Sequence, residues 1–330
     1  MTHHDVRIMA HLPGLVWGYD FSGGEARPIR EDELDTPAGQ PPGLRWLHLN
    51  LSDQRTLRWL ATALPERMTA LLLAPEDEHA FLLEGDMLGL ALQDIEHDFQ
   101  GGDPRMVGLR VVIGPSMVIT ARRHPVRSAD RMKRRIEGGA RPDGPADTLE
   151  LVLASLLEVF RDTTTELEAK VQEIEDEMLK DLSAADARQF ITLRALMVRL
   201  RRTFTGLRNL LRRLEEEAGT APVYGQTAAR AVARLAALDA DLLAAQGQLR
   251  LLRDELDLQA AQQTNRNLYF LSILTALLMP ATLITGIFGM NTGGLIWISD
   301  RYGSLWATGL AAGTALIAYL LLRLSGFIRR

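Results

Sequence analysis

The feature that most constrains this chain is a pair of uncharged apolar stretches near its C-terminal end. The first runs from Leu268 to Met290 and the second from Tyr302 to Leu322. A helix needs roughly 20 apolar residues to cross a bilayer, and each stretch provides them. The pair therefore predicts two transmembrane helices joined by a short loop. A buried hairpin of a soluble protein is the alternative, but the lack of charge inside both stretches favours the membrane.

Charges at the ends of these stretches predict the topology. Arg266 precedes the first stretch, and Arg323, Arg329 and Arg330 follow the second. The loop between them holds only Asp300 and Arg301. By the positive-inside rule, we expect both termini in the cytoplasm and the loop outside.

Composition limits the other possibilities. The 330 residues suffice for one or two soluble domains in addition to the hairpin. A net charge of -5 implies no bulk attraction to nucleic acid, and the absence of cysteine excludes disulfides and thiolate metal sites. Residues 1–7 hold no long apolar run, so we expect no cleaved signal peptide. The sequence has no phosphate-binding loop, nucleophile elbow or metalloprotease motif, and therefore does not predict an enzyme.

Residues 1–135 predict a cytoplasmic α/β domain, which makes the soluble part of the chain α+β. A helical stretch between Asp53 and Leu73 interrupts several strand-like runs. The runs at 107–113 and 117–120 flank a Gly-Pro-Ser turn and predict a β-hairpin. The other strand-like runs are residues 14–19, 44–49 and 87–92.

The remaining soluble part predicts long packed helices. Leucine seams at steps of three and four run through residues 136–222, expected to form outer helices, and through 223–267, expected to form a stalk. Between Val223 and Met290 the only proline is Pro280, so this third helix is expected to continue unbroken into the membrane. At 1.5 Å per residue it would be about 100 Å long.

Opposite charges follow one another along these helices. An acidic run from Glu166 to Asp181 precedes an arginine-rich helix that also carries a leucine seam. We expect the two to pair in antiparallel fashion and neutralise each other, with nucleic-acid binding as the alternative. The arginines are Arg188, Arg194, Arg199, Arg201, Arg202, Arg208, Arg212 and Arg213.

One face of the first membrane helix is small and polar. Polar side chains in a membrane helix lie at an interface or along a water-filled path. The pattern alone leaves two interpretations open, a pore lining or hydroxyls that bond a neighbouring helix or their own backbone. The stripe consists of Asn265, Leu268, Ser272, Thr275, Met279, Thr282 and Gly286, and Asn291 follows just past the end of the helix.

The tripeptide Gly289-Met290-Asn291 lies where this helix leaves the membrane. In this position it resembles the signature of the CorA family of divalent-cation transporters. Met279-Pro280, Thr282 and Gly286 also resemble the family's first membrane helix, and the order of parts matches over nearly the whole chain. The resemblance implies a funnel-shaped homopentamer in the bacterial inner membrane, with residues 268–290 lining a central pore and residues 302–322 outside them. Residues 291–301 would then be the external loop and 323–330 a basic cytoplasmic tail.

The pore interpretation has a physical basis. Mg²⁺ and similar ions give up water reluctantly, and Asn291 side-chain carbonyls can accept hydrogen bonds from a hydrated ion. Together with Gly289 and Met290, Asn291 is the expected selectivity filter at the pore mouth. Leu268 and Met279 can form apolar constrictions. Gly286 serves either close approach in the pore or tight helix packing.

The continuation of the motif points to a branch of the family. Thr292-Gly293-Gly294 is similar to the ZntB branch, which is associated with zinc and implies import coupled to protons. We therefore expect Zn²⁺ as the transported cation, with no cofactor. The alternatives are a Mg²⁺ or Co²⁺ channel gated by cytosolic metal and a membrane-anchored scaffold protein. Asp300 is the nearest loop acid, either attracting cations or pairing with Arg301.

Histidines give little support for a resident metal site. The seven histidines show no clean zinc-ligand spacing. Asp94, Glu96 and His97 form a small cluster that would either sense cytosolic metal or lie solvated on the surface.

Overall fold

The computed structural model describes residues 14–29, 43–97, 104–180, 187–217, 222–290 and 301–325. The chain divides into two compact units, Met1–Arg250 and Leu251–Arg330. The first unit holds an α/β domain and a three-helix bundle, and the second holds the apolar helices.

A seven-stranded sheet forms the centre of the α/β domain, in the order β2-β1-β3-β7-β6-β5-β4. Neighbouring strands are antiparallel except β3 and β7, which are parallel. The predicted hairpin is β6–β7, with Val112 opposite Ile119. The strands are β1 (Leu15–Ser22), β2 (Glu25–Pro28), β3 (Leu44–Asn50), β4 (Ala80–Glu84), β5 (Met87–Ile95), β6 (Met106–Ile113) and β7 (Met117–Arg122).

Strands β2 and β4 were not among the predicted elements. The four residues of β2 lack an apolar alternation, and this strand exists because a tight turn folds it back onto β1. Gly23 and Gly24 in that turn have φ of 60° and 83°, a region in which glycine is favoured.

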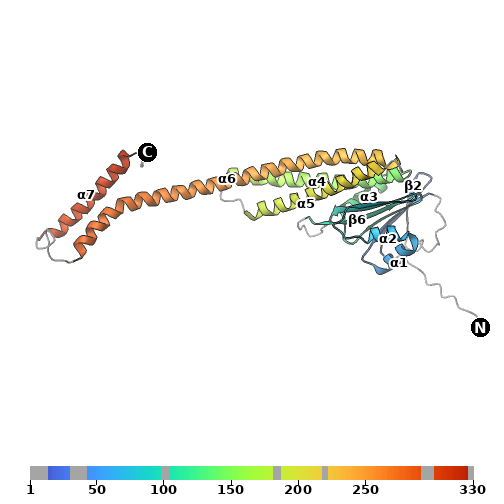
Figure 1. Ribbon diagram of the computed structural model, residues 1–330, viewed down its shortest axis with the longest axis horizontal. Coiled ribbons are helices and arrows are strands. Elements are labelled where there is room, and N and C mark those ends of the chain that lie inside the picture. The colour runs from blue at the N-terminus through green and yellow to red at the C-terminus, as the bar shows by residue number, and fades with distance from the viewer. Residues whose placement is uncertain are drawn as a thin grey trace, which may run out of the picture. The chain divides into compact units, whose positions relative to one another are not determined.

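Helices cover both faces of the sheet (Figure 1). The predicted helical stretch forms α1 (Gln54–Ala63) and α2 (Glu66–Leu72), which pack on one face. On that face Leu47 and Leu49 share an apolar core with Leu60 and Met68. The opposite face meets α3 (Arg127–Glu137), α4 (Pro145–Lys180) and α5 (Ala187–Glu217).

The bundle consists of α4, α5 and the first part of α6 (Pro222–Gly289). Helices α4 and α5 are antiparallel, and the Phe160 and Phe204 rings meet with centroids 5.2 Å apart. Helix α6 runs parallel to α4, since Arg230 pairs with Glu150 and Gln248 with Glu175. The predicted leucine seams are buried, among them Leu200, Leu207, Leu214, Leu235 and Leu242.

The expected neutralisation between the acidic run and the arginine helix is wrong for two of the arginines. Arg208 and Arg201 of α5 pair instead with Asp239 of α6, at 3.2 and 3.7 Å. Both arginines lie on the flank of α5 that faces α6. Acids of α4, including Glu158 and Glu166, pair with arginines of α3.

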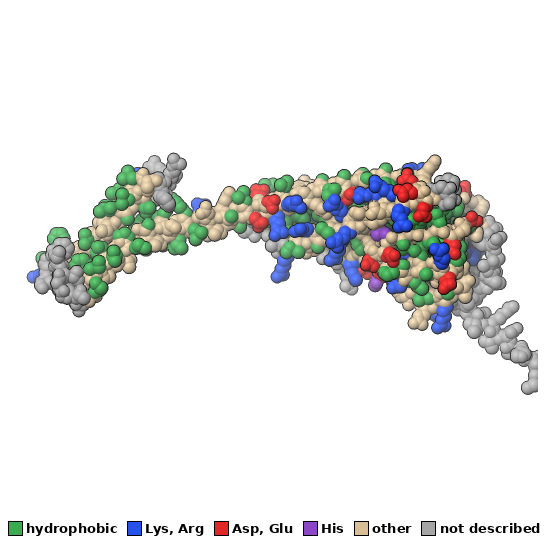
Figure 2. Space-filling model, in the orientation of Figure 1, with side chains coloured by type: hydrophobic (Ala, Val, Ile, Leu, Met, Phe, Trp, Pro, Cys, Tyr) green, Lys and Arg blue, Asp and Glu red, His purple; other side chains and the backbone are tan. Residues whose placement is uncertain are grey.

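Among the described residues, two helices are long and apolar enough to cross a membrane, one within α6 and the other α7 (Gly303–Leu324). Helix α6 is continuous to Gly289, as predicted, and contains Pro280. In Figure 2 hydrophobic side chains cover the visible face of the last part of α6 and of α7, whereas most charged side chains lie over the rest of the chain.

Candidate cation pathway on the first membrane-spanning helix

All seven residues of the small polar stripe lie on the second half of α6. Their steps of three and four place them on one helical face. Each is exposed in the single chain, including Leu268 at 57% and Met279 at 65%. Large apolar side chains in such positions require either lipid or further protein around them.

The hydroxyls of this stripe bond their own backbone. Ser272, Thr275 and Thr282 each donate from their Oγ to the carbonyl four residues earlier, all at 2.9 Å. The sequence left open whether these hydroxyls bond their own backbone, and in the structure they do. This bond also leaves each hydroxyl oxygen with free lone pairs and no proton to donate outward. The stripe thus presents hydrogen-bond acceptors, which suit the water shell of a cation.

A shallow groove runs along this face. Thr275, Met279, Thr282 and Gly286 contribute to a hollow of about 820 Å³. Its lining residues belong to α6, except Met290, which follows the helix. A Cβ added to Gly286 would meet nothing within 4 Å. Packing inside the single chain therefore does not require glycine at this position.

Pro280 interrupts the backbone hydrogen bonds beside Met279. Proline has no N–H, so the carbonyl of Ala276 loses its helical donor. The freed carbonyl is a further acceptor at the level of the stripe.

The signature tripeptide begins where α6 ends. Gly289 is the last residue of the helix, and the Met290 N–H donates to the Ile287 carbonyl at 3.4 Å in a tightened final turn. Asn291, the Thr292-Gly293-Gly294 continuation and Asp300 lie outside the described residues, so their roles stay predictions.

The stripe carries no ionisable side chain, and its electrostatics rest on neutral dipoles. Over the described ranges, no group of three or more His, Asp or Glu side chains could hold a metal ion. A cation on this face would therefore meet hydroxyl, amide and carbonyl oxygens, the ligands of hard or hydrated ions.

The cluster Asp94, Glu96 and His97 is not a metal site. Asp94 is completely buried and accepts hydrogen bonds from the N–H groups of Ile95 and Ser128, at 2.6 and 3.0 Å. Burial raises the pKa of its carboxyl to about 6. Glu96 and His97 follow the end of β5 at Ile95 and contact other side chains.

His97 and Glu96 each contact different side chains, so the three residues do not converge on one point. The Nδ1 of His97 lies 2.7 Å from Asp130 Oδ2, and Glu96 is 3.6 Å from His124 and 3.7 Å from Arg105. Asp94 instead caps the start of α3, where the helix has no capping side chain of its own. Both expectations for the cluster fail for Asp94, which neither faces solvent nor is free to bind metal.

A second exposed face of α6, in the first unit, was not predicted as an interaction site. Its side chains are uncharged and, apart from Leu243, small, and a Cβ on Gly247 would meet nothing within 4 Å. The signal was present as an alanine repeat at helical spacing, opposite the leucine seam. Its exposed members are Ala233, Ala236, Ala240, Leu243, Ala244 and Gly247.

Comparison with known proteins shows similarity over most of the chain. A profile of the family described as "CorA-like Mg2+ transporter protein" matches residues 42–324. The zinc transport protein ZntB of Yersinia enterocolitica is 26% identical over 295 residues, covering 87% of this chain and 88% of that protein. The divalent cation transporter CmaX of Pseudomonas aeruginosa is 27% identical over 334 residues, covering 94% and 96%.

A solved structure agrees with the fold. The CorA magnesium transporter from Methanocaldococcus jannaschii superposes with a TM-score of 0.79 at 16% identity, covering 94% of this chain and 98% of that one. The α/β domain, the long helix and the two apolar helices are thus a known arrangement of one chain.

Proposed function

The chain belongs to the family of CorA-like Mg²⁺ transporter proteins, which transport divalent cations, and on this premise we propose that its cargo is Zn²⁺. The observation that carries the proposed pathway is the stripe on α6. Its hydroxyl oxygens are acceptors, it bears no charge, and it is exposed along its whole length in the single chain.

The stripe becomes a pore when copies of α6 surround a common axis. We place five copies in a ring, following the family resemblance. The uncharged face with Ala236, Ala240 and Gly247 supports such an assembly, because small side chains allow helices to approach closely. The open space around Gly286 supports close approach within the membrane as well.

A hydrated cation would enter at Gly289-Met290-Asn291. Asn291 amide oxygens accept hydrogen bonds from its water shell, and Thr282 and Thr275 hydroxyl oxygens take over deeper in the membrane. Met279 and Leu268 form apolar constrictions that gate by excluding water. Asp300 is the candidate for attracting cations to the outer mouth.

Zinc is favoured over magnesium by the residues after the tripeptide. Thr292-Gly293-Gly294 resembles the zinc-associated branch, and a relative named as a zinc transport protein aligns over 87% of the chain. Proton coupling is part of this proposal through that resemblance, with the proton carrier outside the stripe. A Mg²⁺ or Co²⁺ channel gated by cytosolic metal is the second candidate, favoured by the fold shared with a magnesium transporter.

The orientation follows from charge. Arg266 and Arg323 flank the two spans on the same side, so both termini are assigned to the cytoplasm of an inner-membrane protein and residues 291–301 to the outside. A membrane-anchored scaffold does not require a stripe of hydrogen-bond acceptors on α6, so the stripe favours a transporter over a scaffold.

An Asn291→Ala variant tests the pathway. Uptake of Zn²⁺ into proteoliposomes should fall to background, while cross-linking still gives the wild-type oligomer. Asn267→Ala is the matched control, because Asn267 lies on α6 but off the stripe. Uptake by this variant should be unchanged. Normal uptake by Asn291→Ala would refute the assigned pore mouth.

A further inference from the structure

A hollow in the first unit lies between α3, α4, the connection between them and α6. Its volume is about 670 Å³, within the range of small-molecule sites. The floor is apolar, formed by side chains such as Leu151, Leu157 and Leu238, each less than 10% exposed. The rim is charged.

Arginines from four separate segments line this hollow. Arg135 comes from α3, Arg141 from the connection, Arg161 from α4 and Arg234 from α6. Guanidinium groups present several N–H donors in a fixed plane, and no acceptors. Their convergence creates an excess of donors around the apolar floor.

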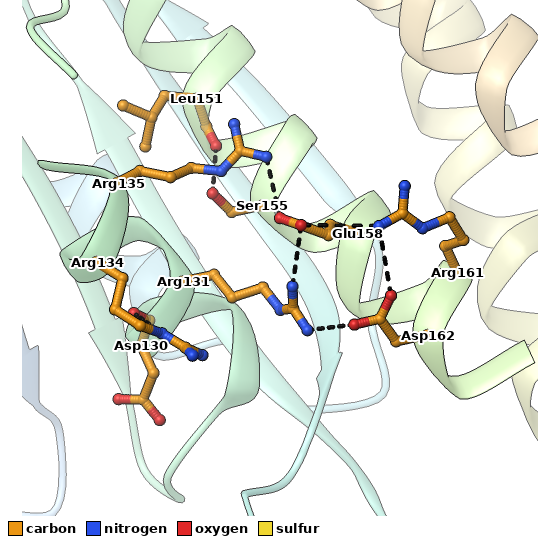
Figure 3. Close-up of polar contacts among 9 residues, drawn as sticks. All are labelled: Asp130, Arg131, Arg134, Arg135, Leu151, Ser155, Glu158, Arg161 and Asp162. Atoms are coloured by element: carbon orange, nitrogen blue, oxygen red, sulfur yellow. Dashed lines mark hydrogen bonds and ion pairs between the residues drawn. The ribbon is translucent and has the colours of Figure 1, made fainter. Parts of the chain in front are cut away.

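The carboxylates at one end are already engaged. Figure 3 shows Arg131 and Arg135 reaching from α3 to Glu158, with Arg161 approaching the same carboxylate from its other side. The distances to Glu158 are 3.1, 3.0 and 3.7 Å, respectively. Hydrogen bonding from Arg135 is the main cause that lowers the pKa of Glu158, so this carboxylate stays ionised.

This end of the hollow has more positive than negative charge. Arg131 and Arg161 also contact Asp162, so three arginines share two carboxylates. Arg135 donates one N–H to Glu158, and its other N–H groups have no hydrogen-bond partner among the described residues.

The other two arginines have no carboxylate within 4 Å among the described residues. Arg141 donates from Nη1 to the carbonyls of Ile136 and Ala140, at 2.7 and 2.8 Å, which leaves its charge uncompensated. Arg234 is exposed and makes no ion pair or hydrogen bond within the described ranges.

Two acids, Asp147 and Glu150, also line this side of the hollow. Glu150 is held by Arg230 at 2.6 Å. Asp147 accepts from the Asp143 N–H at 3.3 Å and is the one lining carboxylate without a described arginine partner. The positive charge of the hollow thus exceeds the negative charge.

We propose that this hollow binds a phosphate-bearing small molecule. Arg234 and Arg141 bind its phosphate oxygens, since arginine matches phosphate geometry with paired N–H donors. The apolar floor accommodates an organic group such as a nucleoside. Because Arg234 belongs to α6, the ligand joins α6 to α3 and α4 inside the first unit. The site is independent of the proposed cargo and pore.

Calorimetric titration of the full chain in detergent tests the proposal. ATP, adenosine and inorganic pyrophosphate would be added in the presence of a chelator, so that no metal bridges protein and phosphate. ATP or pyrophosphate should bind saturably and adenosine should not. Arg234→Ala and Arg141→Ala should each weaken binding about tenfold, the effect of losing one charged hydrogen-bond partner.

Two further variants distinguish specific binding in the hollow from non-specific attraction of phosphate to exposed arginines. Arg212→Ala removes an exposed arginine of α5 outside the hollow and should leave affinity unchanged. Asp147→Asn removes the unpaired acid and should tighten binding, a gain that misfolding cannot produce. ATP binding more tightly than pyrophosphate would assign the floor to the nucleoside, and equal affinity would assign the site to phosphate alone. No saturable binding, or an equal loss in Arg212→Ala, would overturn the proposal.

Discussion

Arg122 of β7 donates from Nε to the Nε2 of His48 on β3, at 3.2 Å. This contact makes Nε2 the acceptor and leaves Nδ1 to bond Thr120 Oγ1 at 2.9 Å. The ring also stacks on Trp17, with centroids 4.9 Å apart. His48 is therefore held neutral in the sheet, and burial lowers its pKa to about 3.

This neutral histidine predicts a loss of stability in acid. Between the folded pKa near 3 and the ordinary value of 6.5, the unfolded chain binds a proton that the folded chain does not. The free energy of unfolding should therefore fall as pH drops from 6.5, by about 1.4 kcal/mol per pH unit from this group. Thermal unfolding followed by tryptophan fluorescence, at pH 7 to 4, measures it.

His48→Gln is the comparison that isolates the effect. The variant should be less stable at pH 7, but the difference from wild type should shrink as the pH falls. The raised pKa of Asp94 acts in the opposite direction between about 4 and 6 and is common to both proteins, so it cancels. A constant difference across the range would contradict the assignment.

Asp239 links α5 to α6 in the bundle. Its side chain is 13% exposed and pairs with Arg208 and Arg201. Asp239→Asn should lower the free energy of unfolding by about 1.5–3 kcal/mol, as for hydrogen bonds to charged groups. Asp241→Asn, an exposed acid two residues later, should change it by less than about 0.5 kcal/mol. Equal effects in chemical denaturation would refute a specific role for Asp239.

Gly206 of α5 lies against His79, the residue just before β4, and the two positions should be energetically coupled. A Cβ at Gly206 would lie 2.4 Å from the His79 ring. Gly206→Ala should therefore destabilise by about 1–3 kcal/mol through overpacking. In the Gly206→Ala, His79→Ala double variant the loss should be smaller than the sum of the two singles. Additive losses would mean that the clash is not with His79.

Variants of two threonines of α6 distinguish a role of the hydroxyls in the cation pathway from a role in helix structure. Thr282 lies on the stripe and bonds the Leu278 carbonyl, whereas Thr285 lies off it and bonds the Thr282 carbonyl at 3.0 Å. Thr282→Val should reduce metal uptake at least about tenfold, because a methyl group replaces the acceptor oxygen. Thr285→Val should retain uptake. Equal loss in both would indicate that the hydroxyls serve helix structure only.

The sequence predicted the elements with strong local patterns. The β6–β7 hairpin, the leucine seams and the unbroken α6 follow from alternation, from spacing and from the lack of breakers. It did not predict β2, whose four residues lack an apolar alternation, or α3, whose start depends on a contact distant in the chain. Helix α3 begins against the buried carboxylate of Asp94, on a strand 34 residues before Ser128.

The candidate site, too, was predicted only in part from the sequence. Spacing alone placed Ser272, Thr275 and Thr282 on one face of a helix. Their hydrogen bonds to the preceding turn, and thus the acceptor character of that face, became visible only with side-chain positions. Ion pairs between helices, such as Arg208 with Asp239, depend on the rotation of each helix about its axis. The charge pattern of the sequence does not determine that rotation.

Metal uptake into proteoliposomes holding the purified chain tests the central claim most directly. Zn²⁺, Mg²⁺ and Co²⁺ would be compared with and without an imposed pH gradient. We expect Zn²⁺ uptake that exceeds uptake of the other two metals and rises with the proton gradient. Mg²⁺ uptake that does not depend on the pH gradient and is inhibited by Mg²⁺ inside the vesicles would contradict the zinc assignment. No uptake of any metal by an intact oligomer would contradict the pathway itself.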